Sequence, residues 1–545
     1  MKQALERVRA ACSDTTLWRD LAPLIIALTC APWIFLGWAN YSQAPLFRDP
    51  GMYVYVAWCL AKGERIYDTI ATPDGPLIYL ISYLLLVFGM AEQAIRRADL
   101  WLHLVGSLAT GALLAPIDGA LARWRRVVTA SVWSVTHASI WLVLILHFEI
   151  GNNVQREQYY CLLGMGAVVL AYRGVSATSA RAETAMLIAA GLLSALQLFG
   201  KQTGLIYLLL VGLVVILAPR GSRTLTWRAR RVALGAAAAI GLMLAFIAAF
   251  GSLRGFVFWY FRYAFTVYRH WFPIDFWGPV SGRAHLEYAT LAALTLAGGG
   301  TALAVRLLPR HALAFVLAPT AHYLLALLQQ KGWQYHFIPN LTSAFLLYGV
   351  ALREVWKGPP DAQSWTSVRA FGAVALMLFV ESRIFWFAQY GAWLKPTEHF
   401  KHPEVEDTRR AADLLRTSTK PTDRVFFYGR DAIMLYLARR RPAAPHEVAW
   451  MLNFEPALRP PTTPEQRLRI EALAKQVHDD LCRRLRQRPP EALLIQDGTV
   501  ETGPDGLQKL TEFCPDFGSA VPTRYQQLHT VGNIRIFTAK APEAR

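Results

Sequence analysis

Long apolar runs separated by short basic clusters constrain the fold of this chain more than any other feature of its sequence. The 545 residues are 54% hydrophobic and 12% aromatic, with a mean hydropathy of +0.27, which is too apolar for an ordinary soluble enzyme of this length. The formal charge of +18 would suggest nucleic acid in a soluble protein, but these cations lie between apolar runs and act as topology signals. The sequence therefore predicts a polytopic α-helical protein whose partner is the lipid bilayer and not a nucleic acid.

Eleven apolar stretches are expected to cross the membrane. Residues 1 to 19 carry several cations ahead of the first stretch, which is too long for the core of a signal peptide, so we expect the N-terminus in the cytoplasm. The expected spans are 21-41, 96-117, 127-147, 158-172, 184-200, 203-218, 232-250, 286-306, 311-328, 338-352 and 368-388. This odd number of crossings predicts that the C-terminus lies outside.

The stretch from Leu77 to Met90 is expected to lie along the outer face or to dip into it without crossing. It has only about 14 apolar residues, a length more typical of an interfacial or re-entrant helix than of a span. The positions of the cations agree with this. Arg123 and the block from Arg220 to Arg231 fall in the cytoplasm if the stretch does not cross, and outside if it does.

The composition becomes polar after about Gln389, with charge runs and many prolines, which predicts a transmembrane domain at 1-388 and an extracytoplasmic domain at 389-545. Within the second domain, Arg424 to Tyr428 and Ala492 to Gln496 are typical of short buried strands. Residues 526-538 resemble a hairpin that turns at Gly532-Asn533.

Helices are expected in the same region at 404-417, 431-439 and 464-486, the third with a capping residue at Thr463. The region is therefore predicted to be a small α/β domain. The six cysteines show no zinc-ligand spacing, but Cys482 and Cys514 would lie in an oxidising compartment and could pair.

The loops expected on the outer face hold both acids and cations. A carboxylate suits deprotonation of an acceptor hydroxyl, and Arg, Lys, Tyr and His suit a phosphate leaving group through charge-assisted hydrogen bonds. An acid beside a membrane is costly unless it is paired, hydrated or functional, which draws attention to Asp49 in the first loop. The residues in question are Asp49, Glu157, Arg262, Arg269, Lys331, Tyr335 and His336.

A purely structural interpretation of such residues competes with the functional one. Tyrosine and tryptophan beside a span most often form an interfacial belt, and a lone interfacial arginine or lysine more often reaches toward lipid head groups than toward a substrate. Asp68 and Asp74 lie in a turn rich in proline and glycine, where acids commonly serve the turn itself.

The order of the motifs resembles that of the GT-C glycosyltransferases, in particular the protein O-mannosyltransferases and the lipid A aminoarabinose transferases. The resemblance rests on a first-loop acid before an aromatic helix, RDPGMYVYVAWCLAKGERIYD, and on a proline turn before a short apolar helix, TPDGPLIYLISYLLLVFG. It implies that a sugar moves from a polyprenyl-phosphate donor, with inversion, to a hydroxyl of an envelope glycan, lipid or protein on the outer face. No cofactor is implied and no metal is required, although two carboxylates could hold a divalent ion.

The resemblance also implies roles for individual residues. Asp49 matches the catalytic first-loop acid, and Glu157 matches the second-loop acid. The groups expected to contact the donor phosphate are Arg269 as first choice and Arg262 as second, together with Lys331, Tyr335 and His336.

This sequence departs from its relatives at two places. Pro50 follows Asp49 where relatives commonly have a second acid, so the assisting acid stays open. Asp74-Gly75 stands where relatives of the lipid A type place a lysine, which moves the expected phosphate-binding cation to Lys331 or an arginine.

Two other classes of protein fit a polytopic chain of this kind. A transporter or flippase for a lipid-linked component would also have ionisable residues facing a cavity, although the sequence shows no internal repeat. A catalytically silent scaffold or sensor that presents the outer domain is the third possibility. A transport assay and a donor-consumption assay on Asp49→Asn separate the three.

Overall fold

The structure, a computed structural model, falls into two compact units. It describes residues 27–32, 34–35, 37–39, 41–46, 48–116, 123–146, 156–219, 223–271, 283–329, 331, 334–357, 403–445, 449–459 and 462–540. The first unit comprises Met1–Gln43, Arg96–Gly241 and Ile274–Leu394, and the second comprises Ala44–Ile95, Leu242–Pro273 and Lys395–Arg545. The boundary expected between 388 and 389 lies outside the described residues. The second unit adds two segments from the N-terminal half of the chain to the C-terminal region.

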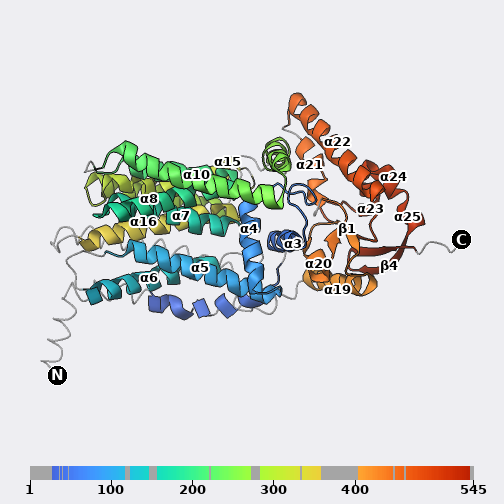
Figure 1. Cartoon of the computed structure of the whole chain (residues 1–545), viewed down its shortest axis with the longest axis horizontal. Coiled ribbons are helices and arrows are strands. Elements are labelled where there is room, and N and C mark those ends of the chain that lie inside the picture. Colours follow the sequence, from blue (N-terminus) through green and yellow to red (C-terminus); the bar gives the residue numbers. More distant parts are fainter. Residues whose placement is uncertain are drawn as a thin grey trace, which may run out of the picture. The chain divides into compact units, whose positions relative to one another are not determined.

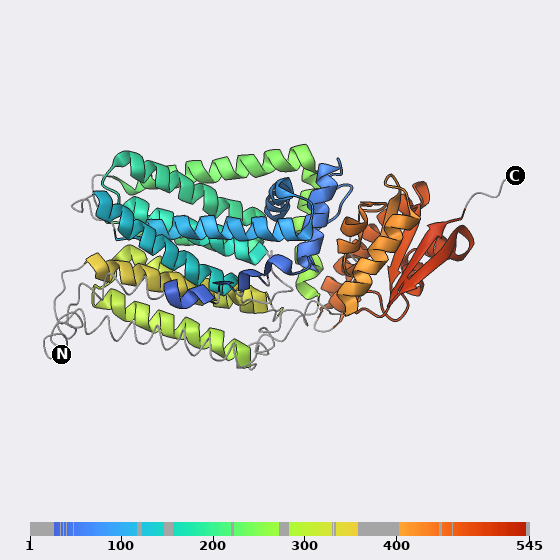
Figure 2. The ribbon, with the colours of Figure 1, turned by 90° about the horizontal axis from the view of Figure 1, so that it is seen from below.

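The first unit is a bundle of long helices that run side by side (Figures 1 and 2). The helices are α5 (Glu92–Leu114), α6 (Arg123–Leu146), α7 (Arg156–Val175), α8 (Ala180–Leu196), α9 (Leu205–Ile216), α10 (Leu225–Phe250), α14 (Arg283–Ala304), α15 (Leu313–Leu328) and α16 (Ile338–Lys357). Each of them overlaps one expected span. The expected span at 21-41 lies partly outside the described residues, and the one at 368-388 lies wholly outside them.

Three of the described helical stretches are long and apolar enough to cross a membrane, namely Ala180–Phe199, Leu225–Phe250 and Arg310–Leu328. A fourth would be added if Pro76–Phe88 and Glu92–Leu114 formed one span, but these two helices are bent by 114°. The described helices thus support a membrane protein, whereas the expected total of eleven spans remains a prediction.

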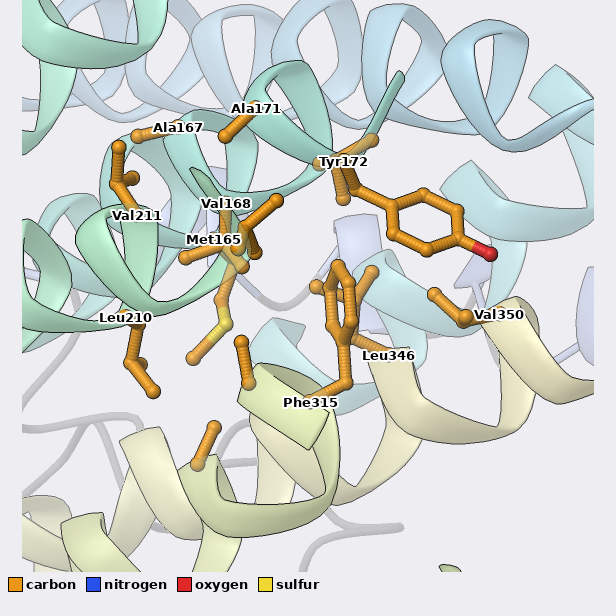
Figure 3. Close-up of a cluster of buried hydrophobic side chains, with 14 of the residues drawn as sticks. Met165, Ala167, Val168, Ala171, Tyr172, Leu210, Val211, Phe315, Leu346 and Val350 are labelled. Atoms are coloured by element: carbon orange, nitrogen blue, oxygen red, sulfur yellow. The ribbon is translucent and has the colours of Figure 1, made fainter. Parts of the chain in front are cut away.

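The core of the bundle is a cluster of buried side chains on α7, α9, α15 and α16 (Figure 3). Met165 and Val168 of α7 lie there with Phe315 of α15. Helices α8 and α10 approach closely at a glycine, because a Cβ at Gly191 of α8 would clash with the backbone of Val232 in α10. Small residues at such crossings are a usual means of packing membrane helices.

The N-terminal segments of the second unit form short helices. They are α3 (Asp49–Ala61), α4 (Pro76–Leu85), η1 (Leu86–Phe88), α11 (Leu253–Phe256), η5 (Val257–Tyr263), α12 (Ala264–Thr266) and η6 (Tyr268–His270). Ile66 joins the two segments, because its N–H donates to the carbonyl of Phe250 at 3.0 Å and its carbonyl accepts from Ser252 at 3.1 Å. The loop that carries Asp49 is therefore tied to the segment that carries Arg262 and Arg269.

The C-terminal part of the second unit is built on a five-stranded sheet with the order β2-β1-β3-β5-β4. The strands are β1 (Arg424–Tyr428), β2 (Arg441–Pro442), β3 (Ala492–Gln496), β4 (Tyr525–Val531) and β5 (Ile534–Ala539). Strand β1 is parallel to both β2 and β3, with Val425 opposite Ala492, and β4 and β5 form the antiparallel hairpin. Both strands and the hairpin predicted from sequence are confirmed.

Helices and short helical turns accompany this sheet. They are α19 (Pro403–Ser418), α20 (Ile433–Ala438), η10 (Ala449–Met451), α21 (Glu455–Leu458), α22 (Pro464–Gln487), α23 (Gly506–Phe513), α24 (Pro515–Gly518) and α25 (Val521–Arg524). Thr463 caps α22 in a reciprocal capping box with Gln466, as its position before the helix predicts. Cys482 and Cys514, whose pairing the sequence left open, form a disulfide with Cα atoms 5.5 Å apart. The C-terminal region is therefore an α/β domain.

Candidate active site

Glu157 lies in the first turn of α7 and is the centre of a buried charged group in the first unit. Its side chain is 1% exposed, and its Oε1 accepts a hydrogen bond from Lys201 Nζ at 2.7 Å. The guanidinium Nε of Arg156 lies 3.5 Å from the same oxygen. Lys201 reaches this position from the extended turn between α8 and α9. A buried ion pair of this kind holds two helix ends together, because removing either partner leaves an uncompensated charge.

His336 and Lys331 join this group from the segment before α16. His336 Nε2 lies 3.9 Å from Glu157 Oε1. Burial lowers the pKa of His336 well below its usual value, and the charges of Lys201, Arg156 and Lys331 lower it further, so the ring is neutral at pH 7 and its contact with Glu157 is not an ion pair. Burial also lowers the pKa of Lys331 to about 7. Tyr335 lies in η8 (Gln334–Phe337), but its side chain is outside the described part of the structure.

A small cavity opens beside these groups. It is lined by Glu157, Tyr160, Lys201, Thr203, His322, Leu325, Gln329, His336 and Pro339. In this lining, Lys201 and the neutral imidazole of His336, which can donate a hydrogen bond, would suit the oxygens of a phosphate. No cluster of three or more His, Cys, Asp or Glu side chains that could hold a metal occurs in the parts of the chain that the structure describes.

Asp49 is the first residue of α3 in the second unit and is half-buried. It follows Arg48, whose backbone has φ 54° and ψ −131°, a conformation that non-glycine residues rarely adopt. Such a conformation costs about 1 to 3 kcal/mol and persists only where the surrounding structure enforces it, as it often does at active sites. The N-terminus of α3 favours negative charge at Asp49, and the rest of the helix, from Pro50 to Leu60, is buried.

Arg262 and Arg269 lie in the second unit with Asp49. Arg262 is exposed in the π-helical segment η5, with its guanidinium 5.7 Å from the centre of the Phe258 ring. Arg269 is exposed in η6. The structure therefore groups the site residues in two sets. Glu157, Lys331 and His336 belong to the first unit, whereas Asp49 and the two arginines belong to the second.

Comparison with known proteins gives similarity in structure alone. No family model matches the sequence, and no curated protein matches it. ArnT from Cupriavidus metallidurans in the apo state is similar with a TM-score of 0.52 at 13% identity, over 94% of this chain and 97% of that one. The chain has an ArnT-like fold. The same ArnT bound to undecaprenyl phosphate also gives a TM-score of 0.52 at 13% identity, over 96% and 98% of the two chains.

The Archaeoglobus fulgidus oligosaccharyltransferase in the apo form is less similar, with a TM-score of 0.43 at 13% identity over 88% of this chain and 70% of that one. ArnT belongs to the GT-C superfamily, so the resemblance drawn from the motifs is confirmed at the level of the fold.

Sequence reasoning missed Lys201, which pairs with Glu157 in this ArnT-like fold. Its only local signal is a lysine between two apolar runs, at 184-200 and 203-218, where an unexplained charge indicates a function or a partner.

Asp99 was missed as well, although it lies inside the expected span at 96-117. The hydroxyls of Tyr41 and Tyr159 both donate to its carboxylate, and His103 Nε2 lies 3.7 Å from its Oδ1. Because Tyr159 follows Glu157 by two residues on α7, this fully buried network fixes the end of the helix that carries Glu157.

Proposed function

We propose that this protein is a membrane glycosyltransferase that moves a sugar from a polyprenyl-phosphate donor to a hydroxyl acceptor on the outer face of the cytoplasmic membrane. The observation that carries the proposal is the buried pair of Lys201 and His336 beside Glu157 at a cavity in an ArnT-like fold, with Lys331 close enough for its charge to act on His336. Arg156 and Lys201 both lie beside the single Glu157 carboxylate, so the group has a surplus of positive charge that a phosphate would balance. The similar ArnT was solved with undecaprenyl phosphate bound, which supports a polyprenyl phosphate as the ligand.

In the proposed reaction, Asp49 takes the proton of the acceptor hydroxyl. The acceptor oxygen then attacks the anomeric carbon opposite the phosphate, and the bond from that carbon to the phosphate oxygen breaks, which inverts the anomeric centre. The electron pair leaves with the polyprenyl phosphate. Lys331, His336, Tyr335, Arg269 and Arg262 stabilise the developing charge of this leaving group, the kind of electrostatic term that usually contributes most to catalysis.

Glu157 is proposed as the second acid of the reaction. Since its Oε1 accepts a hydrogen bond from Lys201, we assign it the task of holding that lysine in place at the cavity. The proposed reaction requires no cofactor. The N-terminus in the cytoplasm and the α/β domain outside complete the proposed topology.

The test uses the purified full chain in lipid nanodiscs, and measures consumption of polyprenyl-phosphate sugars together with binding of undecaprenyl phosphate. Asp49→Asn should reduce transfer by about 100- to 10,000-fold, because an amide cannot take the proton, while phosphate binding stays unchanged. Asp68→Asn, which changes an exposed acid of the same loop, is the matched control. If Asp49→Asn keeps full turnover, Asp49 is not the base and Glu157 becomes the next candidate.

A further inference from the structure

The C-terminal sheet has a topological switch point. Strand β1 lies between β2 and β3 and is parallel to both, so the chain continues from β1 first to one side and then to the other. In open α/β sheets, ligands bind outside the carboxyl ends of the strands at such a point. Here that place is the carboxyl end of β1 and β3, where Arg430 and Asp431 follow one strand and Gln496 ends the other.

Charged side chains of both signs meet there. The backbone N–H of Arg430 donates to Gln496 Oε1 at 2.9 Å, which joins the two strand ends. The Arg430 guanidinium donates to Glu404 Oε2 at 2.7 Å, and its Nε lies 3.6 Å from Asp431 Oδ2. Glu501, from the loop after β3, is close enough for its charge to act on both Arg430 and Asp431. The cluster therefore offers carboxylates and a guanidinium side by side.

Several of these polar atoms are buried without a hydrogen bond. Asp431 is 2% exposed, and its Oδ1 has no hydrogen-bond partner among the described residues. The same holds within the described chain for Glu501 Oε2 and Arg430 Nε. Buried polar atoms are nearly always satisfied in folded proteins, so these atoms mark a place where a polar partner would be favourable. Two carboxylate oxygens therefore lack a donor in the described part of the chain, and Arg430 Nε has only its ion-pair contact with Asp431 at 3.6 Å.

The cluster lies beside the helix that begins with Asp49. Helix α3 lies next to α20 (Figure 1). The two pack so closely that a Cβ at Gly51 would be 2.7 Å from the Cβ of Ile433. Asp49 precedes Gly51 by two residues, and Asp431 precedes Ile433 by two residues. The charge of Arg48 also acts on the Asp431 carboxylate. The open atoms of the cluster thus lie near the candidate base.

We propose that this cluster, formed by Arg430, Asp431 and Glu501, is the acceptor subsite and that it binds a carbohydrate. Each hydroxyl of a sugar can donate to a carboxylate and accept from a guanidinium, which matches the mixture of open acceptors and donor. The inference rests on the proposed function, because it supplies the hydroxyl that Asp49 deprotonates. It further assigns recognition of the acceptor to the C-terminal α/β domain.

The protonation state of the Asp431 carboxyl group agrees with a role in binding carbohydrate. The pKa of Asp431 is raised to about 6, chiefly by burial and also by the charges of Glu404 and Glu501, against the lowering effect of the Arg430 and Arg48 charges. The carboxylate is therefore ionised at neutral pH and loses its acceptor strength as the pH falls through about 6. Carbohydrate binding should weaken in the same range.

Binding of free sugars to the full chain tests the proposal without requiring turnover. The probe is an equimolar mixture of maltose, cellobiose and chitobiose, observed by saturation-transfer difference NMR in a detergent without a sugar head group. The wild type and Asp49→Asn should both bind. Asp431→Asn and Glu501→Gln should each weaken binding by about tenfold or more, the effect of losing one hydrogen bond to a charged group.

Asp516→Asn, which removes an exposed carboxylate of the same domain, is the control and should bind like the wild type. If Asp431→Asn does not fold, carbohydrate binding by Glu501→Gln and the pH dependence of binding by the wild type test the proposal instead. The proposal is overturned if the wild type gives no signal, or if Asp431→Asn and Glu501→Gln bind as well as the control. Failure of the proposed function is a separate result, since it would appear as unchanged turnover in Asp49→Asn.

Discussion

The backbone N–H of Leu46 donates a hydrogen bond to Glu92, with the nitrogen 2.7 Å from Oε1. The intervening segment, which contains α3 and α4, therefore returns to the place where it began. The segment is also held to the C-terminal region close to Glu92, because the carbonyl of Met90 accepts from Tyr436 at 2.6 Å and from Arg439 at 2.8 Å. A segment closed at its base makes no net crossing, which favours the expectation that Leu77 to Met90 does not span the membrane.

This contact leads to a prediction about topology. In a variant without native cysteines, Met90→Cys should react with an impermeant thiol reagent added to spheroplasts, because Met90 is half exposed beside the α/β domain. Ser222→Cys, in the basic block expected in the cytoplasm, should react only after the membrane is opened. Labelling of Ser222→Cys in intact spheroplasts would reject the proposed orientation.

The ion pair between Glu157 and Lys201 should contribute strongly to stability. Lys201→Met leaves the buried Glu157 carboxylate with Arg156, 3.5 Å away, in place of its closer partner, and breaking a buried pair typically costs about 3 to 5 kcal/mol. The double variant Glu157→Gln/Lys201→Met should recover part of the loss, because it removes the buried carboxylate together with the lysine, although Arg156 keeps its charge. Thermal unfolding of the full chain in detergent measures both effects.

Lys475→Met is the matched control for that experiment. Lys475 also forms an ion pair, with Asp479 at 2.7 Å, but both side chains are exposed. Exposed pairs contribute little, so the melting temperature should hardly change. If Lys201→Met and Lys475→Met unfold at the same temperature, the pair at Glu157 is not the buried contact described above.

Binding of undecaprenyl phosphate should depend on pH through Lys331. The pKa of this buried lysine is lowered to about 7, so its ammonium is present below that value and is lost as the pH rises through it. Affinity for the phosphate should therefore fall as the pH rises above about 7. Lys331→Arg should keep binding but lose this dependence, because a guanidinium stays charged. If the affinity of Lys331→Arg for undecaprenyl phosphate depends on pH as that of the wild type does, Lys331 does not bind the phosphate.

The disulfide between Cys482 and Cys514 should stabilise the C-terminal domain. The cysteines are 32 residues apart, and closing a loop of this length is worth about 3 to 4 kcal/mol in the chain-entropy account. Cys482→Ser/Cys514→Ser should lower the unfolding temperature to that of the reduced wild type. Thiol labelling of the denatured, unreduced wild type should leave both cysteines unmodified, and labelling of either one would show that the bond does not form in the cell.

Local signals in the sequence determined much of the fold. The apolar runs between 96 and 352 each contain a helix, because a run of that length can bury its backbone only by forming hydrogen bonds within itself. Thr463 was recognised as a cap and Gly532 as part of a hairpin turn, since each depends on a few neighbouring residues. The aromatic and branched side chains of Arg424 to Tyr428 similarly identified β1.

The tertiary structure alone decided how the site is assembled. The residues near Glu157 in the sequence do not indicate that Lys201, 44 positions away, is its partner. Likewise, no local rule places Asp431 beside Arg48 or joins the first loop to the α/β domain. Helix formation and capping act over a few residues, so a sequence displays them directly. The pairing of buried charges depends on which helix ends meet, and that is set by the packing of the whole chain.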